Sequence, residues 1–391
     1  MMNIPYGKQH ITDEDIQAVT EALKSDYLTQ GPKIKEFEEA FAAYVGANYA
    51  VAVANGTAAL HLNALALDVK PGDKVITTPI TFAASANCVR YCGGEVVFGD
   101  IDPNYLLDIN SVKKLLEESP LGTYSGIIPV DFAGRACNLE EFRKLANEYN
   151  LWILEDSCHS PGGYFIDSNN VKQQCGNGNY ADLAIFSFHP VKHIACGEGG
   201  MITTNNAELY KRLLILRTHG ITKNEREFKN SISLAGGKDS YPLWYMEMQE
   251  LGYNYRLTDF QAALGLSQLK RAEDGLIRRK QIASNYAKAF DGESFVKGQS
   301  GDVEGHAYHL YIIEVEDRLG LYNYLRTMNI FTQIHYIPTH LMPYYQTFGW
   351  KEGDRIYSET YYKNCISLPM YPTLTEEEQN YVIEKVKSFY E

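Results

Sequence analysis

The stretch "AIFSFHPVKHIACGEGGMITT", residues 184–204, places a lysine between two strand-like runs. The apolar run at 184–188 is typical of a buried strand, three glycines (Gly197, Gly199 and Gly200) indicate a turn, and a second strand-like run follows. A lysine in an exposed loop would more often have Asp, Asn or Ser as neighbours. The pattern therefore predicts that Lys192 is held inward at the end of a strand.

Around this stretch the chain alternates between strand-like and helical patterns. The runs "YAVAV", "KVITT", "GIIPV", "LWILED" and "AIFSF" are short and apolar, and segments such as "NGTAALHLNALAL" and "NLEEFRKLANEYN" between them have helical character. Alternation of this kind predicts an α/β fold with a mostly parallel sheet covered by helices.

The alternation changes after about residue 220. Residues 222–250 are expected to form a polar, mobile insertion. A capping-box pattern at Thr258 predicts a long helix running toward Phe290, and the remaining chain is typical of a smaller α+β domain. We therefore expect an N-terminal arm and large domain over residues 1–250 and a small C-terminal domain over 251–391.

Composition narrows the classes of function. The 391 residues carry a net charge of -13, which argues against a nucleic-acid partner. The N-terminus lacks the pattern of a signal peptide, and the most apolar stretch, 49–69, is interrupted by polar residues, so no membrane span is expected. Seven cysteines without a regular framework favour reduced thiols and a cytoplasmic location.

Two motifs at predicted strand ends could bind a ligand. In "VANGTAAL", a strand ends at Asn55 and a helix begins at Gly56 and Thr57, where free backbone N–H groups could hold a phosphate. In "LWILEDSCH", Asp156 and His159 follow a strand, at the sheet edge where α/β proteins bind ligands. Taken alone, each motif has an ordinary reading as a helix cap, an ion pair or a packed histidine.

The lysine completes a set of groups. Burial lowers the pKa of a lysine and makes its amine a nucleophile toward carbonyls, although a lone lysine more often extends to solvent. Lys192, Asp156, Ser187, the phosphate seat and the aromatic Phe82 fall on successive strand ends. Pyridoxal phosphate needs a lysine for its Schiff base, a carboxylate at its pyridine nitrogen and a phosphate anchor. The combination therefore predicts this cofactor.

Eight motifs carry a family resemblance. In chain order they are "LTQGPKIKEFE", "NGTAALHL", "PITFAASAN", "EDSCHS", "SFHPVKHIACGEGG", "LRTHG", "GYNYRLTDFQAALGLSQL" and "SLPMYP". With them the chain resembles the DegT/DnrJ/EryC1/StrS sugar aminotransferases, within the aspartate aminotransferase-like group of fold type I. The resemblance implies a pyridoxal phosphate-dependent transaminase acting as a homodimer with shared active sites.

Two further motifs, "IPYGKQ" and "QIHYIPTHLMPYY", are similar to one subgroup of that family. Its members transfer an amino group to C4 of a UDP-4-keto-6-deoxy-N-acetyl-hexosamine in pseudaminic acid biosynthesis. L-glutamate is the amino donor that the family implies. The resemblance thus names a nucleotide-sugar substrate and a donor.

The resemblance also assigns roles to residues. Lys192 would form the Schiff base and move the proton, Asp156 would face the pyridine nitrogen, Phe82 would stack on the ring and His159 would support it. The phosphate would be held by Gly56, Thr57, Ser187 and, from the neighbouring subunit, Asn254. The nucleotide sugar would be lined by Tyr6, Thr29, His335 and Tyr336.

Other functions remain open at this level. Another sugar or carbon within the family is one, and a non-catalytic sensor that binds pyridoxal phosphate is a second. Related sugar dehydratases have histidine in place of the Schiff-base lysine, which is intact here. Cys158, His159, Cys175, His189, His193 and Cys196 could be imagined as zinc ligands. Their spacing matches no zinc motif, so no metal is expected, and the absence of a GxGxxG motif disfavours a nicotinamide dehydrogenase.

Overall fold

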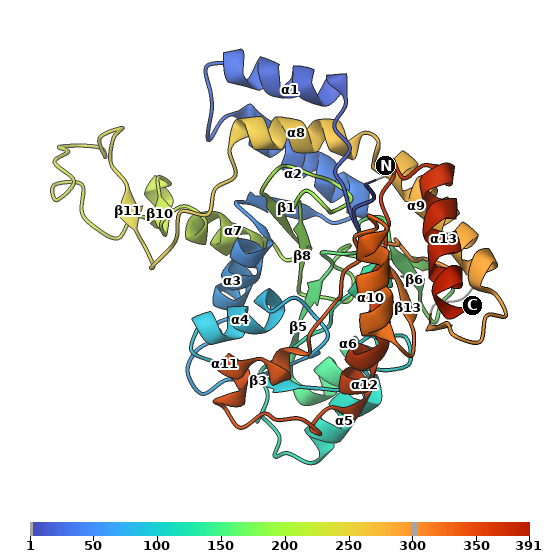
Figure 1. Cartoon of the computed structure of the whole chain (residues 1–391). Helices are drawn as coiled ribbons and strands as arrows, with labels where there is room; N and C mark the ends of the chain where they lie inside the picture. The colour runs from blue at the N-terminus through green and yellow to red at the C-terminus, as the bar shows by residue number, and fades with distance from the viewer. Residues whose placement is uncertain (1–2, 299–302) are drawn as a thin grey trace.

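A central sheet organises the computed structural model, which describes residues 3–298 and 303–391 (Figure 1). Its seven strands lie in the order β1-β9-β8-β5-β4-β2-β3. They are β1 (Tyr49–Val53), β9 (Gly200–Thr204), β8 (Leu183–Ser187), β5 (Trp152–Asp156), β4 (Gly126–Ile128), β2 (Lys74–Thr77) and β3 (Glu95–Phe98). Strand β9 pairs antiparallel with both neighbours and the other pairings are parallel, so the predicted α/β class is confirmed.

Helices cover both faces of this sheet. They are α3 (Gly56–Ala66), α4 (Ala84–Tyr91), α5 (Ile109–Glu117), α6 (Leu139–Tyr149) and α7 (Ala207–Leu216). Successive strand residues point to opposite faces: Leu154 joins the core under α3, α4 and α7, whereas Ile153 joins the core under α5 and α6. Both faces are therefore apolar, as expected for a sheet buried between helices.

A third hydrophobic cluster joins the N-terminal helices to the sheet near its edge strand β1. Helices α1 (Asp13–Lys24), α2 (Pro32–Val45) and α8 (Asp259–Leu269) lie together at the top of Figure 1. Phe37 and Phe41 of α2 contact Phe186 and Phe188, which flank the end of β8. This aromatic packing supports the strand end that precedes Lys192.

A smaller antiparallel sheet forms a separate hydrophobic core in the C-terminal part of the chain. It contains β12 (Lys297–Gly298), β13 (Tyr311–Glu314) and β14 (Cys365–Leu368) and packs with α9 (Ala272–Phe290), α10 (Arg318–Thr327) and α13 (Glu376–Tyr390). Ile4, near the N-terminus, is buried in the same core. Helix α8, which follows residue 250, packs instead on α1 and α2, and the domain boundary at residue 250 stays a prediction.

Three shorter features complete the fold. They are α11 (Pro343–Gln346), α12 (Ile356–Asn364) and the hairpin of β6 (Tyr164–Ile166) with β7 (Lys172–Gln174).

The predicted capping box of Thr258 with Gln261 is confirmed, but the prediction of a single long helix is wrong. Helix α8 ends at Leu269 and the next helix begins at Ala272; between them, the Arg271 side chain binds Asp15 of α1. No Pro or Gly marks this break, so the sequence pattern missed it.

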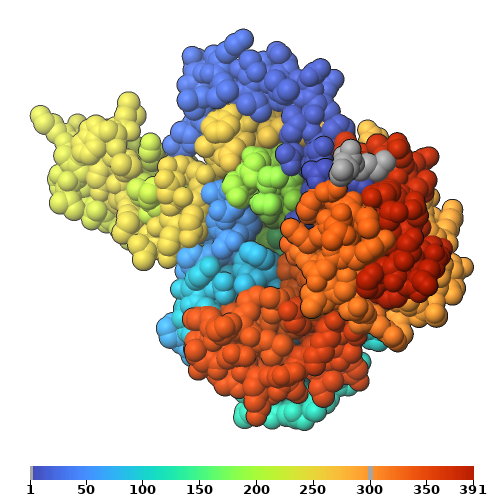
Figure 2. Space-filling model, in the orientation of Figure 1, coloured from blue at the N-terminus to red at the C-terminus, as the bar shows by residue number. Residues whose placement is uncertain are grey.

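The insertion at 222–250 projects from the body of the protein (Figures 1 and 2). It holds the short strands β10 (Ile221–Thr222) and β11 (Glu247–Met248), paired antiparallel. The expectation of a polar segment was incomplete, because it also exposes large apolar side chains. These are Leu234, Leu243, Trp244, Met246 and Met248. Among the described helices, none has the length and apolar character needed to span a membrane.

Candidate active site

A cavity of about 890 Å³ opens at the carboxyl ends of the parallel strands. Its walls come from the ends of β1, β5 and β8, from the N-terminal segment and from residues 333–337. Ten predicted site residues line it: Tyr6, Gly56, Thr57, Phe82, Asp156, His159, Ser187, Lys192, His335 and Tyr336. The structure thus brings most of the predicted set to one place.

Lys192 lies in the turn after β8 and faces this cavity. Its backbone N–H donates to the carbonyl of His189 at 2.8 Å, which fixes the turn. Burial lowers the pKa of its amine, and the positive charge of Arg279 acts in the same direction, whereas Cys158 and Asp156 oppose the shift. The environment therefore favours the neutral, nucleophilic amine more than water does.

Asp156, the last residue of β5, is 4% exposed. One carboxylate oxygen accepts a 2.6 Å hydrogen bond from the Ser85 hydroxyl, and the other accepts from the Cys158 N–H at 3.1 Å. These donors orient the carboxylate at the cavity wall. An oriented carboxylate is suited to hold a proton on a heterocyclic nitrogen. Ser85 was not among the predicted residues, although it lies inside the quoted "PITFAASAN" motif.

His159 is buried beside Asp156 in a defined tautomer. The Ala133 backbone N–H donates to its Nδ1 at 3.2 Å, so the ring proton is on Nε2, which lies 3.3 Å from the Tyr336 hydroxyl. Burial and then the charge of Lys192 lower the pKa of His159 well below its usual range. The imidazole is therefore neutral and can donate from Nε2 to a group in the cavity.

The helix start that "VANGTAAL" predicts is confirmed, because α3 begins at Gly56. The Asn55 side chain caps α3 by accepting the Ala58 N–H at 2.8 Å, which leaves the Gly56 and Thr57 N–H groups without intrahelical partners. Gly56 is not needed for a left-handed turn; instead, a Cβ at this position would lie 3.1 Å from the Cβ of Ser187. Glycine keeps the space beside the Ser187 hydroxyl open, at the positive end of the helix.

Phe82 stands at the cavity wall with 64% of its surface exposed. Its ring centroid is 6.3 Å from that of Tyr336. An aromatic ring this exposed gains little from the protein core, because few apolar atoms cover it. It is available to cover a planar ligand.

The predicted substrate residues separate into two groups. Tyr6 lies 5.4 Å from His335 between ring centroids, and both line the cavity with Tyr336. Burial, followed by the charge of Lys192, lowers the pKa of His335 to about 3. Thr29 instead pairs with Thr258 on an exposed segment, outside the cavity wall. The described residues therefore do not bring Thr29 to the site, and its substrate role stays a prediction.

Asn254 also lies away from the cavity of its own chain. It forms an isolated bridge with Thr218, whereas its neighbour Tyr255 lines the cavity. The predicted role of Asn254 involves the neighbouring subunit, so that role stays a prediction.

His309 is a cavity residue that the sequence did not reveal. It is 4% exposed, and its ring centroid lies 4.3 Å from that of His159. Its Nδ1 has no hydrogen-bond partner among the described residues. Arg279 holds it in place, since Nη1 donates to the His309 carbonyl at 3.3 Å. The only signal in the sequence is a histidine directly before an apolar run, which is too common to predict a site.

The cavity satisfies the requirements of pyridoxal phosphate. It offers a lysine with lowered pKa, an oriented carboxylate, an exposed aromatic ring and two free N–H groups at a helix N-terminus. The space that Gly56 keeps open beside Ser187 suits a phosphate, and a side chain there would fill it. Lys192, Asp156, Phe82, Gly56 and Ser187 are the residues that would hold the cofactor.

Comparison with known proteins supports this interpretation. The DegT/DnrJ/EryC1/StrS aminotransferase family model matches residues 9–387. The chain is 39% identical to the spore coat polysaccharide biosynthesis protein SpsC of Bacillus subtilis, covering 98% of this chain and 96% of that protein. It is 35% identical to a UDP-4-amino-4,6-dideoxy-N-acetyl-beta-L-altrosamine transaminase of Campylobacter jejuni, covering 99% of each.

A solved structure gives the same result. Helicobacter pylori PseC, an aminotransferase involved in the biosynthesis of pseudoaminic acid, superposes with a TM-score of 0.85 at 28% identity, covering 100% of this chain and 99% of that one. The aspartate aminotransferase-like fold type I is therefore confirmed, as are the enzyme class and the cofactor. The chain belongs to the DegT/DnrJ/EryC1/StrS family and is a pyridoxal phosphate-dependent sugar aminotransferase.

Proposed function

We propose that this enzyme moves an amino group from L-glutamate to C4 of a UDP-4-keto-6-deoxy-N-acetyl-hexosamine of the pseudaminic acid type. The observation that carries the proposal is that Tyr6, His335 and Tyr336 line the same cavity as the residues proposed to hold the cofactor. These side chains come from the two motifs, "IPYGKQ" and "QIHYIPTHLMPYY", that resemble this subgroup. The Campylobacter transaminase and PseC have names in keeping with it.

The cavity residues have distinct tasks in this proposal. When bound, pyridoxal phosphate supplies a carbonyl for the amine and an electron sink for the bond that breaks. Lys192 would accept a proton at its Nζ from the substrate carbon and deliver it to the carbon on the other side of the transferred nitrogen, because its lowered pKa makes a neutral amine accessible. Asp156 holds the proton of the pyridine nitrogen, and neutral His159 donates from Nε2.

Each half-reaction uses the same lysine. Glutamate gives up its amino group in the first and leaves as 2-oxoglutarate, and the keto sugar takes the amino group at C4 in the second. Phe82, which lines the cavity, would cover one face of the ring, and Gly56, Thr57 and Ser187 would bind the phosphate.

We also propose a homodimer with shared sites. The exposed apolar side chains of the 222–250 insertion, together with Tyr27 and Leu28, offer surface that a second copy of the chain would cover. Asn254 would then reach the phosphate in the partner's site. A cytoplasmic location fits the seven free cysteines, since reduced thiols persist in a reducing compartment.

A two-step titration of the holoenzyme tests the substrate. L-glutamate should bleach the visible absorbance of the cofactor, and the donor is then removed. The 4-keto precursor of the L-altro sugar and its C5 epimer of the D series are added to separate samples. Recovery of the absorbance with the first sugar alone supports the proposal, and recovery with the epimer alone contradicts the sugar assignment. Lys192→Ala is the control and should show no exchange.

A further inference from the structure

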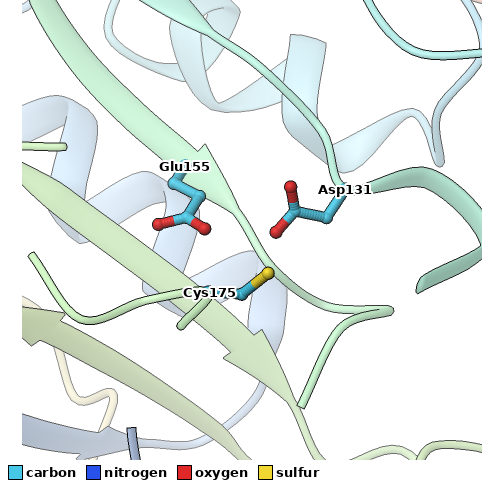
Figure 3. A group of neighbouring side chains, drawn as sticks. All are labelled: Asp131, Glu155 and Cys175. Atoms are coloured by element: carbon cyan, nitrogen blue, oxygen red, sulfur yellow. The ribbon is translucent and has the colours of Figure 1, made fainter. Parts of the chain in front are cut away.

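Two acids and a thiol are buried together behind the active site (Figure 3). Asp131 follows β4, Glu155 precedes Asp156 in β5, and Cys175 follows β7. Asp131 and Glu155 are 0% and 1% exposed, and the polar atoms of the three side chains lie within 4.8 Å of one another. Within residues 3–298 and 303–391, no lysine or arginine forms an ion pair with either carboxyl group.

Two adjacent buried carboxyl groups without a cation cannot both be ionised, because the charges repel and neither is hydrated. In Figure 3 the two groups point toward one another, and their polar atoms lie within 4.8 Å, so a proton on one of the acids removes the repulsion between them. Burial raises the pKa of Glu155 well above its usual range, and the charge of Asp131 raises it further. These observations place one proton on the pair.

The donors around the pair identify which acid is ionised. Asp131 accepts three hydrogen bonds, from the Cys137 N–H at 2.8 Å and from the hydroxyls of Ser160 at 2.7 Å and Ser157 at 3.1 Å. Glu155 accepts the single N–H of Gly176, shared between its two oxygens at 3.1 and 3.0 Å. Hydrogen-bond donors stabilise the ionised form of a carboxyl group. Asp131 has more of them than Glu155, so Asp131 is ionised and Glu155 carries the proton.

Asp131 connects the segments that surround His159. Ser157 and Ser160 stand on either side of His159 in the chain, and both bind the Asp131 carboxylate. The backbone N–H of Asp131 donates to the Asp156 carbonyl at 3.0 Å. The turn that Asp131 begins also presents the Ala133 N–H to His159 Nδ1.

We propose that Asp131 and Glu155 share one proton as a carboxyl–carboxylate pair that positions His159 and Asp156 in the active site. Both are positioning residues, since neither lines the cavity. The inference rests on the proposed roles of His159 and Asp156 toward the cofactor. A single proton keeps the buried charge at one unit, and the carboxylate that remains binds both segments around the histidine.

A cation is the competing occupant of this cluster. An aspartate, a glutamate and a cysteine are a possible ligand set. However, the oxygens of both acids already accept hydrogen bonds from protein donors, which a cation would have to displace. Burial and the two acids raise the pKa of Cys175 well above its usual range, so its sulfur is a thiol and a poor ligand.

Infrared spectroscopy of the holoenzyme tests the proton directly. The difference spectrum of wild type minus Glu155→Gln should contain the C=O stretch of a protonated carboxyl group, shifted in D₂O. It should persist at neutral pH, because burial and the neighbouring Asp131 raise the pKa of Glu155 well above its usual range. Absence of that band, or one equivalent of bound metal in the purified holoenzyme, would overturn the proposal. This measurement does not depend on the substrate. The proposal of a shared proton can therefore be tested even if the proposed substrate is wrong.

Paired variants test the positioning. Glu155→Ala removes the donor to Asp131, and kcat should fall about tenfold or more while KM for glutamate changes less than about threefold. Glu155→Gln keeps an N–H donor. It should recover most of the lost kcat and restore the wild-type pH dependence of the cofactor absorbance. Equal damage by Ala and Gln would contradict a neutral donor at this position.

Asp182→Asn is the control, because Asp182 precedes β8 and contacts Ile153 near the start of β5. Asp182 accepts the Ile153 N–H at 2.7 Å and pairs with Arg143, far from the cavity wall. It should lower the thermal midpoint without altering the absorbance titration. If Asp182→Asn shifts that titration as Glu155→Ala does, a general loss of stability explains both, and the positioning role is excluded.

Discussion

The hydroxyl of Ser85 donates a 2.6 Å hydrogen bond to the carboxylate of Asp156, across 71 residues of sequence. Ser85 lies in the first turns of α4, and Asp156 ends β5. The same hydroxyl is 2.7 Å from the Thr81 hydroxyl, so it stands within a chain of polar groups. The orientation of the Asp156 carboxylate therefore depends on helix α4, which is distant from Asp156 in the sequence.

Ser85→Ala should weaken the enzyme without unfolding it. The carboxylate of Asp156 would keep the Cys158 N–H but lose its second donor, and we expect kcat to fall about tenfold, as for one lost hydrogen bond to a charged group. Steady-state kinetics with the amino donor measure this. Ser125→Ala is the control, because Ser125 donates to the Asp73 carboxylate away from the cavity. An unchanged kcat in Ser85→Ala would mean that this bond does not orient the acid.

Phe82→Ala should weaken cofactor retention and leave folding intact. The ring is 64% exposed, so its removal opens no core cavity and should cost little stability. Loss of stacking on a planar ligand costs about 1 kcal/mol, or about fivefold in affinity. Equilibrium dialysis of pyridoxal phosphate measures the loss. Leu121→Ala, an exposed apolar residue outside the cavity wall, should not change it.

Acid should destabilise this protein more than its carboxylates alone would predict. Burial lowers the pKa of the histidines His159, His193, His306, His309 and His335, to about 3 for His306 and His335. Their neutral forms favour the folded state fully above the usual pKa of 6.5. As the pH falls below 6.5, the unfolded chain binds protons that the folded chain does not, so stability is lost at up to about 1.4 kcal/mol per histidine per pH unit.

Glu155 acts in the opposite direction. Because the pKa of Glu155 is raised, the folded state keeps a proton that the unfolded state releases above about pH 4.5. This reduces the dependence of the unfolding free energy on pH by the equivalent of about one proton. Urea unfolding of the holoenzyme at several pH values below 7 and one protein concentration measures the slope. His306→Asn, outside the cavity, should reduce it by about one proton. A stability that is flat between about pH 6.5 and 5 would contradict this interpretation.

The projecting insertion should control assembly. Replacing Leu243 and Trp244 together by serine removes two large exposed apolar side chains and should raise the dimer dissociation constant about tenfold or more. Sedimentation at matched concentrations measures the change. Leu319→Ser on α10, also largely exposed, is the control. Equal dissociation constants for all three proteins would show that the insertion does not contact a second copy.

Much of the site was readable because strand ends converge. Gly56, Asp156, Ser187 and Lys192 each follow a strand of one sheet, and strands running the same way end at the same edge. A helix start was also local: Thr258 with Gln261 forms the capping box that the spacing indicates. The family motifs then supplied the chemistry.

The sequence by itself therefore determined the α/β class, the cofactor and the residues at the strand ends, because these depend on short-range periodicity and on motifs within a few residues. Only the tertiary structure decided that Ser85 orients Asp156, that Ala133 sets the tautomer of His159 and that His309 packs beside it. The Asp131–Glu155 pair and the break after Leu269 were equally hidden. Each arises from side-chain directions and packing between distant segments, which no local pattern encodes.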